Sequence, residues 1–190
     1  QNGKYLMVST SEKIHFYKVV FKGQTVDSDI LVSLIKEWNR NKISYIASKY
    51  KDTIDYVAIF EDINLSIFCI SDIDGKLQFD ELGSYQYNSE TNRIITAEWN
   101  SHCNKLICGS RDGSVSFIDV VRSEENKQRI IFNIVGRRCN KAARCSSWSP
   151  NGKLLAVGYD DCAIRIWDPF KERCLAVLKS HFDSVKSVYW

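Results

Sequence analysis

The feature that most constrains this chain is a sequence pattern that returns after 49 residues, from Trp99 to Trp148. Each copy begins with a short apolar run that ends in tryptophan, and each contains a second strand-like run of alternating residues. The matched positions are, in chain order, Trp99 and Trp148, Gly109 and Gly158, Asp112 and Asp161, Asp119 and Asp168. A repeat of this length built from short strands predicts stacked β-units, each of which buries its apolar faces against its neighbours.

Strand patterns extend over the whole chain. Apolar and polar residues alternate with enrichment in β-branched and aromatic types, and no segment carries a sustained helical stripe. Residues 30–38 end in Trp38 and residues 184–190 end in Trp190, so both are interpreted as strands of the same kind. The sequence therefore predicts an all-β protein.

Composition favours a packed intracellular protein. Hydrophobic residues make up 44% of the chain and aromatic residues 12%. The seven cysteines are an odd number without a C-x-x-C motif, which favours reduced core thiols. No apolar run reaches the roughly 18 residues of a membrane span, and no signal-peptide pattern opens the chain. We expect a location in the cytoplasm or nucleus and no membrane partner. Because a strand pattern starts at Gln1 without a preceding methionine, we also expect an excerpt of a longer chain.

Two segments resemble the WD repeats of β-propellers. Residues 161–168 resemble the tight turn, third strand and Trp-Asp ending of that family, with Trp167 and Asp168 at the end. Residues 180–190 resemble its Gly-His loop and first strand, with Ser180 in place of glycine. The resemblance implies blades of four antiparallel strands, named a to d from the central channel outward. It is strong for residues 93–190 and weaker for 1–92, where Tyr17 and Phe60 occupy tryptophan positions.

Mapped onto this chain, the resemblance implies about four blades in an incomplete ring. In this assignment Trp38, Trp99 and Trp148 each close a strand a, and residues 71–92 are an additional segment of the second blade. The assigned parts are strands b to d in 1–29, a second blade in 30–92, a third in 93–141, a fourth in 142–183, and the first strand of a further blade in 184–190.

Several motif residues have roles that the resemblance implies. Asp112 and Asp161 lie at hairpin turns, where a carboxylate accepts backbone N–H groups. Family members join a His, a Ser or Thr, an Asp and a Trp in one hydrogen-bonded chain. Here Asp161 and Trp167 match two of its members, while His181 and Asp183 belong to the next blade. We also expect Gly109 and Gly158 to allow close approach between blades.

Charge is unevenly distributed along the sequence. Residues 52–90 contain nine acidic residues and only Lys76 as a base, whereas residues 126–159 contain seven basic residues and no acidic one. A basic loop face around the channel mouth is predicted, which would attract an acidic or phosphorylated peptide or a nucleic-acid backbone. Its candidate residues are Lys49, Lys51, Arg111, Arg137, Arg138, Lys141 and Arg144. The alternative is a set of solvated charged loops without a ligand.

No pattern predicts catalysis, a metal or a cofactor. His102, Cys103 and Cys108 do not provide four converging ligands for zinc, and the three histidines lie far apart in the repeat. Cys145 with His181 lacks a nucleophile elbow and an orienting third group. The glycine-rich residues 109–114 open no helix and so do not form a P-loop.

The sequence therefore predicts a non-catalytic scaffold for protein partners in a multiprotein complex. The alternative is a nucleic-acid or phospho-ligand reader that uses the basic loop face. Residues 76–82 are a second candidate surface, or a tolerated elaboration of the repeat. The fold by itself does not choose between these functions.

Overall fold

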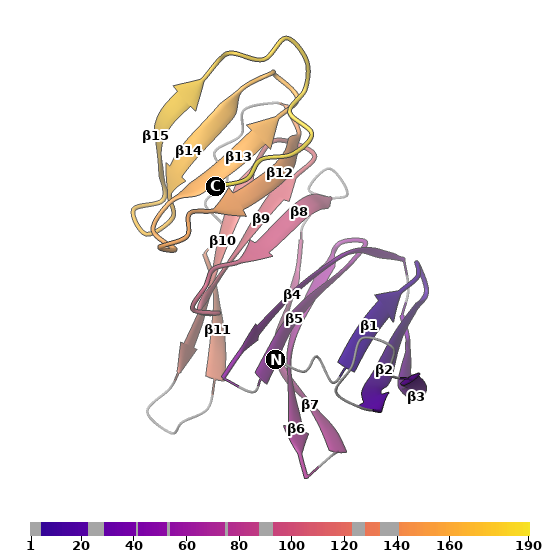
Figure 1. The fold of residues 1–190 in the computed structure, drawn as a ribbon. Coiled ribbons are helices and arrows are strands. Elements are labelled where there is room, and N and C mark those ends of the chain that lie inside the picture. The colour runs from indigo at the N-terminus through magenta and orange to yellow at the C-terminus, as the bar shows by residue number, and fades with distance from the viewer. Residues whose placement is uncertain are drawn as a thin grey trace. The chain divides into compact units, whose positions relative to one another are not determined.

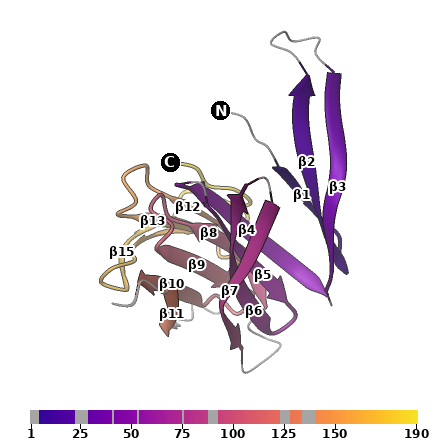
Figure 2. The ribbon, with the colours of Figure 1, turned by 90° about the horizontal axis from the view of Figure 1, so that it is seen from below.

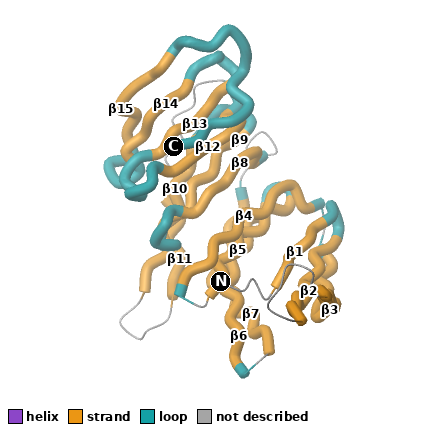
Figure 3. Tube along the Cα trace, viewed as in Figure 1, coloured by secondary structure: helices purple, strands orange, loops and turns teal. Residues whose placement is uncertain are grey.

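The structure, a computed structural model, describes residues 5–22, 29–40, 42–52, 54–74, 76–87, 93–122, 128–133 and 141–190. These residues form strands and turns, with no helix in the ranges given (Figure 1; Figure 3). It follows that no described helix is available to cross a membrane. The all-β prediction is confirmed. The chain divides into two compact units, residues 1–44 and 45–190.

The first unit contains one antiparallel sheet with the order β1-β2-β3. Its strands are β1 (Tyr5–Ser9), β2 (Lys13–Lys22) and β3 (Asp29–Asn39). Phe16 of β2 is buried and meets Trp38 of β3 edge to face, with 5.2 Å between ring centroids.

The prediction for Trp38 is wrong. Residues 30–38 belong to β3, which pairs with β2 as the edge strand of the first sheet and does not open the second blade. The three strands b to d predicted for residues 1–29 are also wrong, because after β1 this range contains the single long strand β2 and β3 begins only at Asp29. Between Lys13 and Lys22 no Gly, Pro, Asn or Asp provides a turn, so the chain continues straight and reverses only after residue 22.

The second sheet has the order β4-β5-β6-β7. Its strands are β4 (Ile43–Lys51), β5 (Ile54–Glu61), β6 (Asn64–Ile73) and β7 (Lys76–Gln86). The strands of this sheet are therefore shifted by one place: β4 takes the inner position that was predicted for residues 30–38, and residues 76–82 are part of the regular outer strand β7. The predicted blade boundary at residue 30 and the extra segment in 71–92 are both wrong. Asp52, Asp62 and Asp74 adopt left-handed φ angles of 49°, 52° and 52°, which allows the tight hairpins between these strands.

The third and fourth sheets confirm the predicted strand order, β8-β9-β10-β11 and β12-β13-β14-β15 (Figure 1). Figure 2 shows β8 to β11 from below. The strands of the third sheet are β8 (Ile94–Trp99), β9 (Lys105–Ser110), β10 (Val115–Arg122) and β11 (Gln128–Asn133). Those of the fourth are β12 (Ala143–Trp148), β13 (Leu155–Tyr159), β14 (Ile164–Asp168) and β15 (Arg173–Leu178). Trp99 and Trp148 close equivalent inner strands of two separate sheets, as expected.

The repeat also determines fine geometry. The pairing of β8 with β9 shifts register between Ile94 and Thr96, and that of β12 with β13 shifts at the equivalent place. In each sheet the residue opposite the bulge is a glycine, Gly109 or Gly158. A Cβ atom at Gly109 would lie 2.9 Å from the Cβ of Ala143 in the next sheet, so glycine is needed for close approach.

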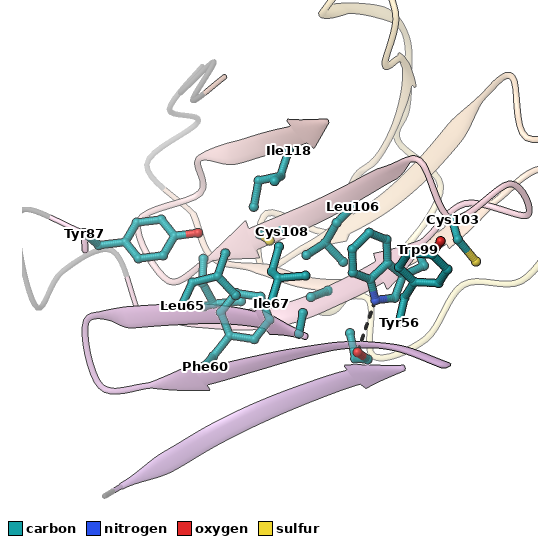
Figure 4. Close-up of a cluster of buried hydrophobic side chains, with 14 residues drawn as sticks. Tyr56, Phe60, Leu65, Ile67, Tyr87, Trp99, Cys103, Leu106, Cys108 and Ile118 are labelled. Carbon is teal, nitrogen blue, oxygen red and sulfur yellow. Dashed lines mark hydrogen bonds between the residues drawn. The ribbon is translucent and has the colours of Figure 1, made fainter. Parts of the chain in front are cut away.

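Two apolar clusters join the three sheets of residues 45–190. One cluster lies between the second and third sheets and includes Phe60, Leu65, Trp99, Leu106 and Ile118 (Figure 4). The other lies between the third and fourth sheets and includes Phe117, Trp148, Leu155 and Trp167. Because each sheet is apolar on both faces, stacking buries both faces of the middle sheet.

Tryptophans of the inner strands also hydrogen-bond across the sheets. The indole N–H of Trp99 donates to the carbonyl of Ala47 in β4 (3.2 Å), and that of Trp148 donates to the carbonyl of Glu98 in β8 (3.0 Å). Trp190 repeats this contact with the carbonyl of Ser147 in β12 (2.8 Å). Residues 179–190 form no strand, unlike the prediction for 184–190, since no described strand pairs with them. The placement of Trp190 is nevertheless that of the other two indoles.

One difference between the repeats yields a stability prediction. Cys162 has φ of 61°, in the left-handed region, where the third sheet has Gly113 (φ 84°). Replacing Cys162 with glycine removes a cost of about 1 kcal/mol for an L-residue in that region, partly offset by the entropy of glycine. We expect C162G to leave the free energy of unfolding unchanged or raise it by up to about 1 kcal/mol in urea denaturation. By contrast C162V, which is β-branched, should lower it by at least about 1 kcal/mol. Equal stability of the two variants would contradict the turn geometry.

Candidate functional site

Three of the predicted basic residues lie at one edge of the third and fourth sheets. Arg111 is exposed in the turn between β9 and β10, and its N–H donates to the carbonyl of Arg93 before β8 (2.9 Å). Lys141 is exposed before β12, and Arg144 is exposed within it. The close approach of Gly109 to Ala143 places these turns side by side. This group, Arg93, Arg111, Lys141 and Arg144, is called the b–c edge below.

Lys49 and Lys51 do not belong to the b–c edge, which corrects the predicted grouping. They lie near the end of β4, where Lys51 Nζ donates to the carbonyl of His102 (3.0 Å). His102 belongs to the turn between β8 and β9, at the opposite edge of the sheet from Arg111. The reason is the one-strand shift in the second sheet: β4 is an inner strand, so its last residues approach an a–b turn.

Arg144 is already paired. Its guanidinium donates two hydrogen bonds to the carboxylate of Asp160, at 2.8 and 2.7 Å, and these bonds lower the pKa of Asp160. Such a two-point ion pair competes with any external anion for Arg144. Arg137 and Arg138 lie outside the described residues. Arg93 was not predicted. Its position directly before an inner strand is that of Ala142 in the next repeat, beside the predicted Lys141.

The two hairpin aspartates have the predicted structural role. Asp112 accepts the N–H of Ser114 (2.9 Å), the hydroxyl of Ser114 (2.6 Å) and the hydroxyl of Ser110. Asp161 accepts the N–H of Ala163 (3.3 Å). Its carboxylate also pairs with Arg165 at 3.0 and 2.5 Å, which lowers the pKa of Asp161. Both turns are therefore fixed by internal bonds.

The four-residue chain of the WD family is not assembled among the described residues. The buried Nε1 of Trp167 has no hydrogen-bond partner there, and its ring packs against Phe117 with 6.3 Å between centroids. His181 and Asp183 are exposed, and Asp183 accepts only its neighbouring N–H, from Ser184 (2.6 Å). Asp168 instead caps the following turn, accepting the N–H groups of Phe170 and Lys171 at 3.0 Å each.

The described part of the chain contains no group of three or more His, Cys, Asp and Glu side chains placed to bind a metal. His102 is exposed and its Nδ1 lies 3.2 Å from Ser101 Oγ. Cys108 is fully buried, and burial raises the pKa of its thiol well above the usual range, so this thiol is a core group and not a nucleophile.

Sequence reasoning missed an open groove of about 770 Å³ at the opposite edge from Arg111. It lies between three turns: 100–104 of the third sheet, and 149–154 and 168–172 of the fourth. Its lining includes His102, Asn104, Asn151, Lys153, Asp168, Phe170 and Lys171. Gly152 has φ of 66°, and a Cβ atom there would come within 3.0 Å of Ser101 Oγ, so two of the turns are in close contact.

Glu98 gives a pH-dependent prediction. Its carboxylate is half-buried between β8 and β12 and accepts the backbone N–H of Trp148 (3.2 Å). Burial raises the pKa of Glu98, so its charged form is disfavoured in the folded state. For an acid with a raised pKa, this cost is present above the folded-state pKa and vanishes as the pH falls below the unfolded value.

Substitution of Glu98 with glutamine removes that charge and keeps an amide oxygen to accept the Trp148 N–H. We expect E98Q to raise the melting temperature at pH 7.5, and the difference from the wild type to shrink towards pH 4. A difference that grows as the pH falls would contradict the burial of this carboxylate.

Comparison with known proteins agrees with this architecture. The family profile "Anaphase-promoting complex subunit 4 WD40 domain" matches residues 121–190. The WD repeat-containing protein srw1 of Schizosaccharomyces pombe is 31% identical over 103 residues, which are 54% of this chain and 17% of that protein. A probable cytosolic iron-sulfur protein assembly protein 1 of Eremothecium gossypii is 30% identical over 45% of this chain and 26% of its own length.

Solved structures extend the likeness to the whole chain. Chaetomium thermophilum Sqt1 bound to the N-terminus of the ribosomal protein L10 superposes with a TM-score of 0.70 and 17% identity, over 98% of this chain and 50% of Sqt1. The chain thus spans half of that protein, and at most about a quarter of the srw1 and iron-sulfur assembly relatives. Its stacked sheets correspond to part of a propeller ring. The chain has the fold of WD-repeat β-propellers, and its residues 121–190 match a WD40 family profile.

Proposed function

We propose that this chain is a non-catalytic scaffold that binds protein partners within an intracellular multiprotein assembly. The observation that carries the proposal is the rigid presentation of turns at both edges of three stacked sheets. Asp112 and Asp161 fix the turns of the b–c edge, and the indole bonds of Trp99 and Trp148 fix one sheet against the next. Short, internally bonded turns on a packed support provide preorganised contacts for a partner.

Two further observations support the proposal. The Sqt1 structure is a propeller with a segment of another protein bound. Other relatives are named for ribosome biogenesis and cytosolic iron-sulfur protein assembly, processes inside the cell. In addition, the thiol of Cys145, which was weighed as a nucleophile beside His181, donates to the carbonyl of Val185 (3.6 Å).

The direct test is purification of the tagged full-length protein with quantification of co-purifying chains. At least one protein should be present in a fixed molar ratio and should re-form the complex when both are purified and mixed. Recovery of the protein alone, from several growth conditions, would contradict the scaffold function.

A reader of nucleic acid or phosphorylated ligands is the second candidate. Its support is the clustering of Arg93, Arg111 and Lys141 at the b–c edge, where Asp112 and Asp161 are held by bonds within their own turns. Against it, the Arg144 side chain is engaged by Asp160.

This second candidate makes its own prediction. Binding to generic double-stranded DNA should weaken steeply with salt, and the variant R111E/K141E should reduce the slope of log K against log salt by about 2, or about 1 per lost phosphate contact. If the protein does not bind DNA at low salt, or if the R111E/K141E variant has an unchanged slope, the nucleic-acid reader is contradicted and the scaffold is the remaining function. A matched control is K153E/K171E, since both lysines are exposed and lie at the opposite edge from Arg111.

A further inference from the structure

The groove of about 770 Å³, which lies at the opposite edge from Arg111, presents hydrogen-bond donors. Oδ1 of Asn104 accepts from Asn100 Nδ2 (2.7 Å), and Oδ1 of Asn151 accepts from Ser149 Oγ (2.7 Å) and the N–H of Lys153 (3.0 Å). The carbonyl oxygens of both amides are thus used within the turns. Their Nδ2 groups donate to no described residue and remain available to a ligand. A ligand in this groove must therefore supply acceptors.

The charge of the groove is positive. Lys153 is exposed and forms no ion pair with a described residue, and Lys171 Nζ lies 4.0 Å from Asp168 Oδ2, at the outer limit of an ion pair. Asp168 is the single carboxylate of the lining, and its Oδ1 already accepts two backbone N–H groups. Both lysines are solvent-exposed, so a ligand carboxylate displaces only weak interactions.

An apolar contact lies beside these donors. The ring of Phe170 is 58% exposed, which leaves apolar surface next to the hydrogen-bond donors. One side of the ring is near the buried Lys105 ammonium, 5.5 Å from the ring centroid. Its remaining surface lines the groove, where an aliphatic side chain of a ligand would cover it.

We propose that this groove binds an extended acidic segment of a partner protein, in which carboxylate side chains alternate with aliphatic ones. Carboxylates would pair with Lys153 and Lys171, backbone carbonyls would accept from Asn104 and Asn151, and an aliphatic side chain would cover Phe170. A polyphosphate backbone fits less well, because it would place phosphates against Asp168 without using the apolar ring. The inference rests on the proposed scaffold function and adds to it the chemistry of one partner.

The test uses two fluorescein-labelled peptides, one with Leu alternating with Asp and one with Leu alternating with Lys. Fluorescence anisotropy with the purified protein should show saturable binding of the acidic peptide only, weakening as salt is added. The variant K153E/K171E should weaken that binding at least about tenfold, and F170A about fivefold, since each lost contact is worth about 1 kcal/mol.

The matched control is K179E/K186E, which makes the same change of charge at exposed lysines outside the groove and should alter the affinity less than twofold. Circular dichroism checks that all variants remain folded. The proposal is overturned if the acidic peptide fails to bind, if the Lys peptide binds equally well, or if K153E/K171E has no larger effect than the control. It is also overturned if a single-stranded RNA oligonucleotide binds the groove more tightly than the acidic peptide. If a partner protein still co-purifies in a fixed molar ratio with the K153E/K171E variant, the scaffold function holds and only the binding role of this groove is rejected.

Discussion

Replacement of Trp99 with alanine is expected to lower the free energy of unfolding by about 3–5 kcal/mol. The indole is 2% exposed, lies 5.9 Å from the ring of Tyr56 in the second sheet and donates to the carbonyl of Ala47 (Figure 4). Its removal leaves a cavity between two sheets and an unsatisfied carbonyl. Urea denaturation followed by far-UV circular dichroism measures the loss.

The conservative variant W99F separates packing from hydrogen bonding. It keeps an aromatic ring and removes the N–H, so a loss of about 1–2 kcal/mol is expected. The W190F variant removes the equivalent N–H at an exposed site and should cost less than W99F. If W99A cost under about 1 kcal/mol, Trp99 would not be part of a buried contact between sheets.

Neutralising Asp119 is expected to destabilise the third sheet by about 3 kcal/mol. The carboxylate of Asp119 pairs with Lys105 Nζ, and the Lys105 side chain is only 7% exposed. Its ammonium also lies between the rings of Phe117 and Phe170, at 6.0 and 5.5 Å from their centroids. The D119N variant leaves this buried cation without its counter-charge.

The reverse change should be milder. In K105M an apolar side chain of similar length fills the space of Lys105, and Asp119, which is 26% exposed, is left in partial contact with water. We expect K105M to cost less than about 1 kcal/mol, and K105M/D119N to be nearly as stable as K105M. Equal losses in D119N and K105M, measured by urea denaturation, would be inconsistent with a buried cation at this position.

The third and fourth sheets could be predicted because their turns carry strong signals. Asp112-Gly113 and the matching Asp161 mark the b–c hairpins, and the 49-residue spacing fixes the inner strands around Trp99 and Trp148. The strand order and the close approach at Gly109 followed from the same pattern, and both are confirmed.

The first two sheets show where pattern reasoning failed. Residues 30–38 form an apolar run that ends in Trp38, but such a run fits an outer strand as well as an inner one, because period-2 alternation does not encode position in a sheet. The β2–β3 hairpin is decided by long-range pairing over ten residue pairs. The turns at Asp52 and Asp62 use a single aspartate in the left-handed region, a weaker signal than the Asp-Gly pair that the sequence has at residues 74–75.

The candidate sites were only partly predictable. Arg111 and Lys141 could be placed at one edge, because a b–c turn and the start of an inner strand share one edge of a sheet; that they bind a partner stays a prediction. The pairing of Arg144 with Asp160 depends on the register between β12 and β13, which includes a bulge and could not be predicted from the sequence. The groove of Lys153 and Phe170 was missed because three turns, separated by up to about 70 residues, provide its lining.

The central claim is that inner strands of successive repeats lie beside one another in different sheets, joined by indole hydrogen bonds. An assigned nitrogen-edited NOESY spectrum tests it directly through the indole protons of Trp99 and Trp148. We predict cross-peaks from the Trp148 indole N–H to the α-protons of Glu98 and Trp99, and from the Trp99 indole N–H to Ala47 and Ser48, since the bonds measure 3.0 and 3.2 Å. Cross-peaks confined to β12–β13 for Trp148 and to β8–β9 for Trp99, with rapid exchange of both protons, would contradict the stacking of these sheets.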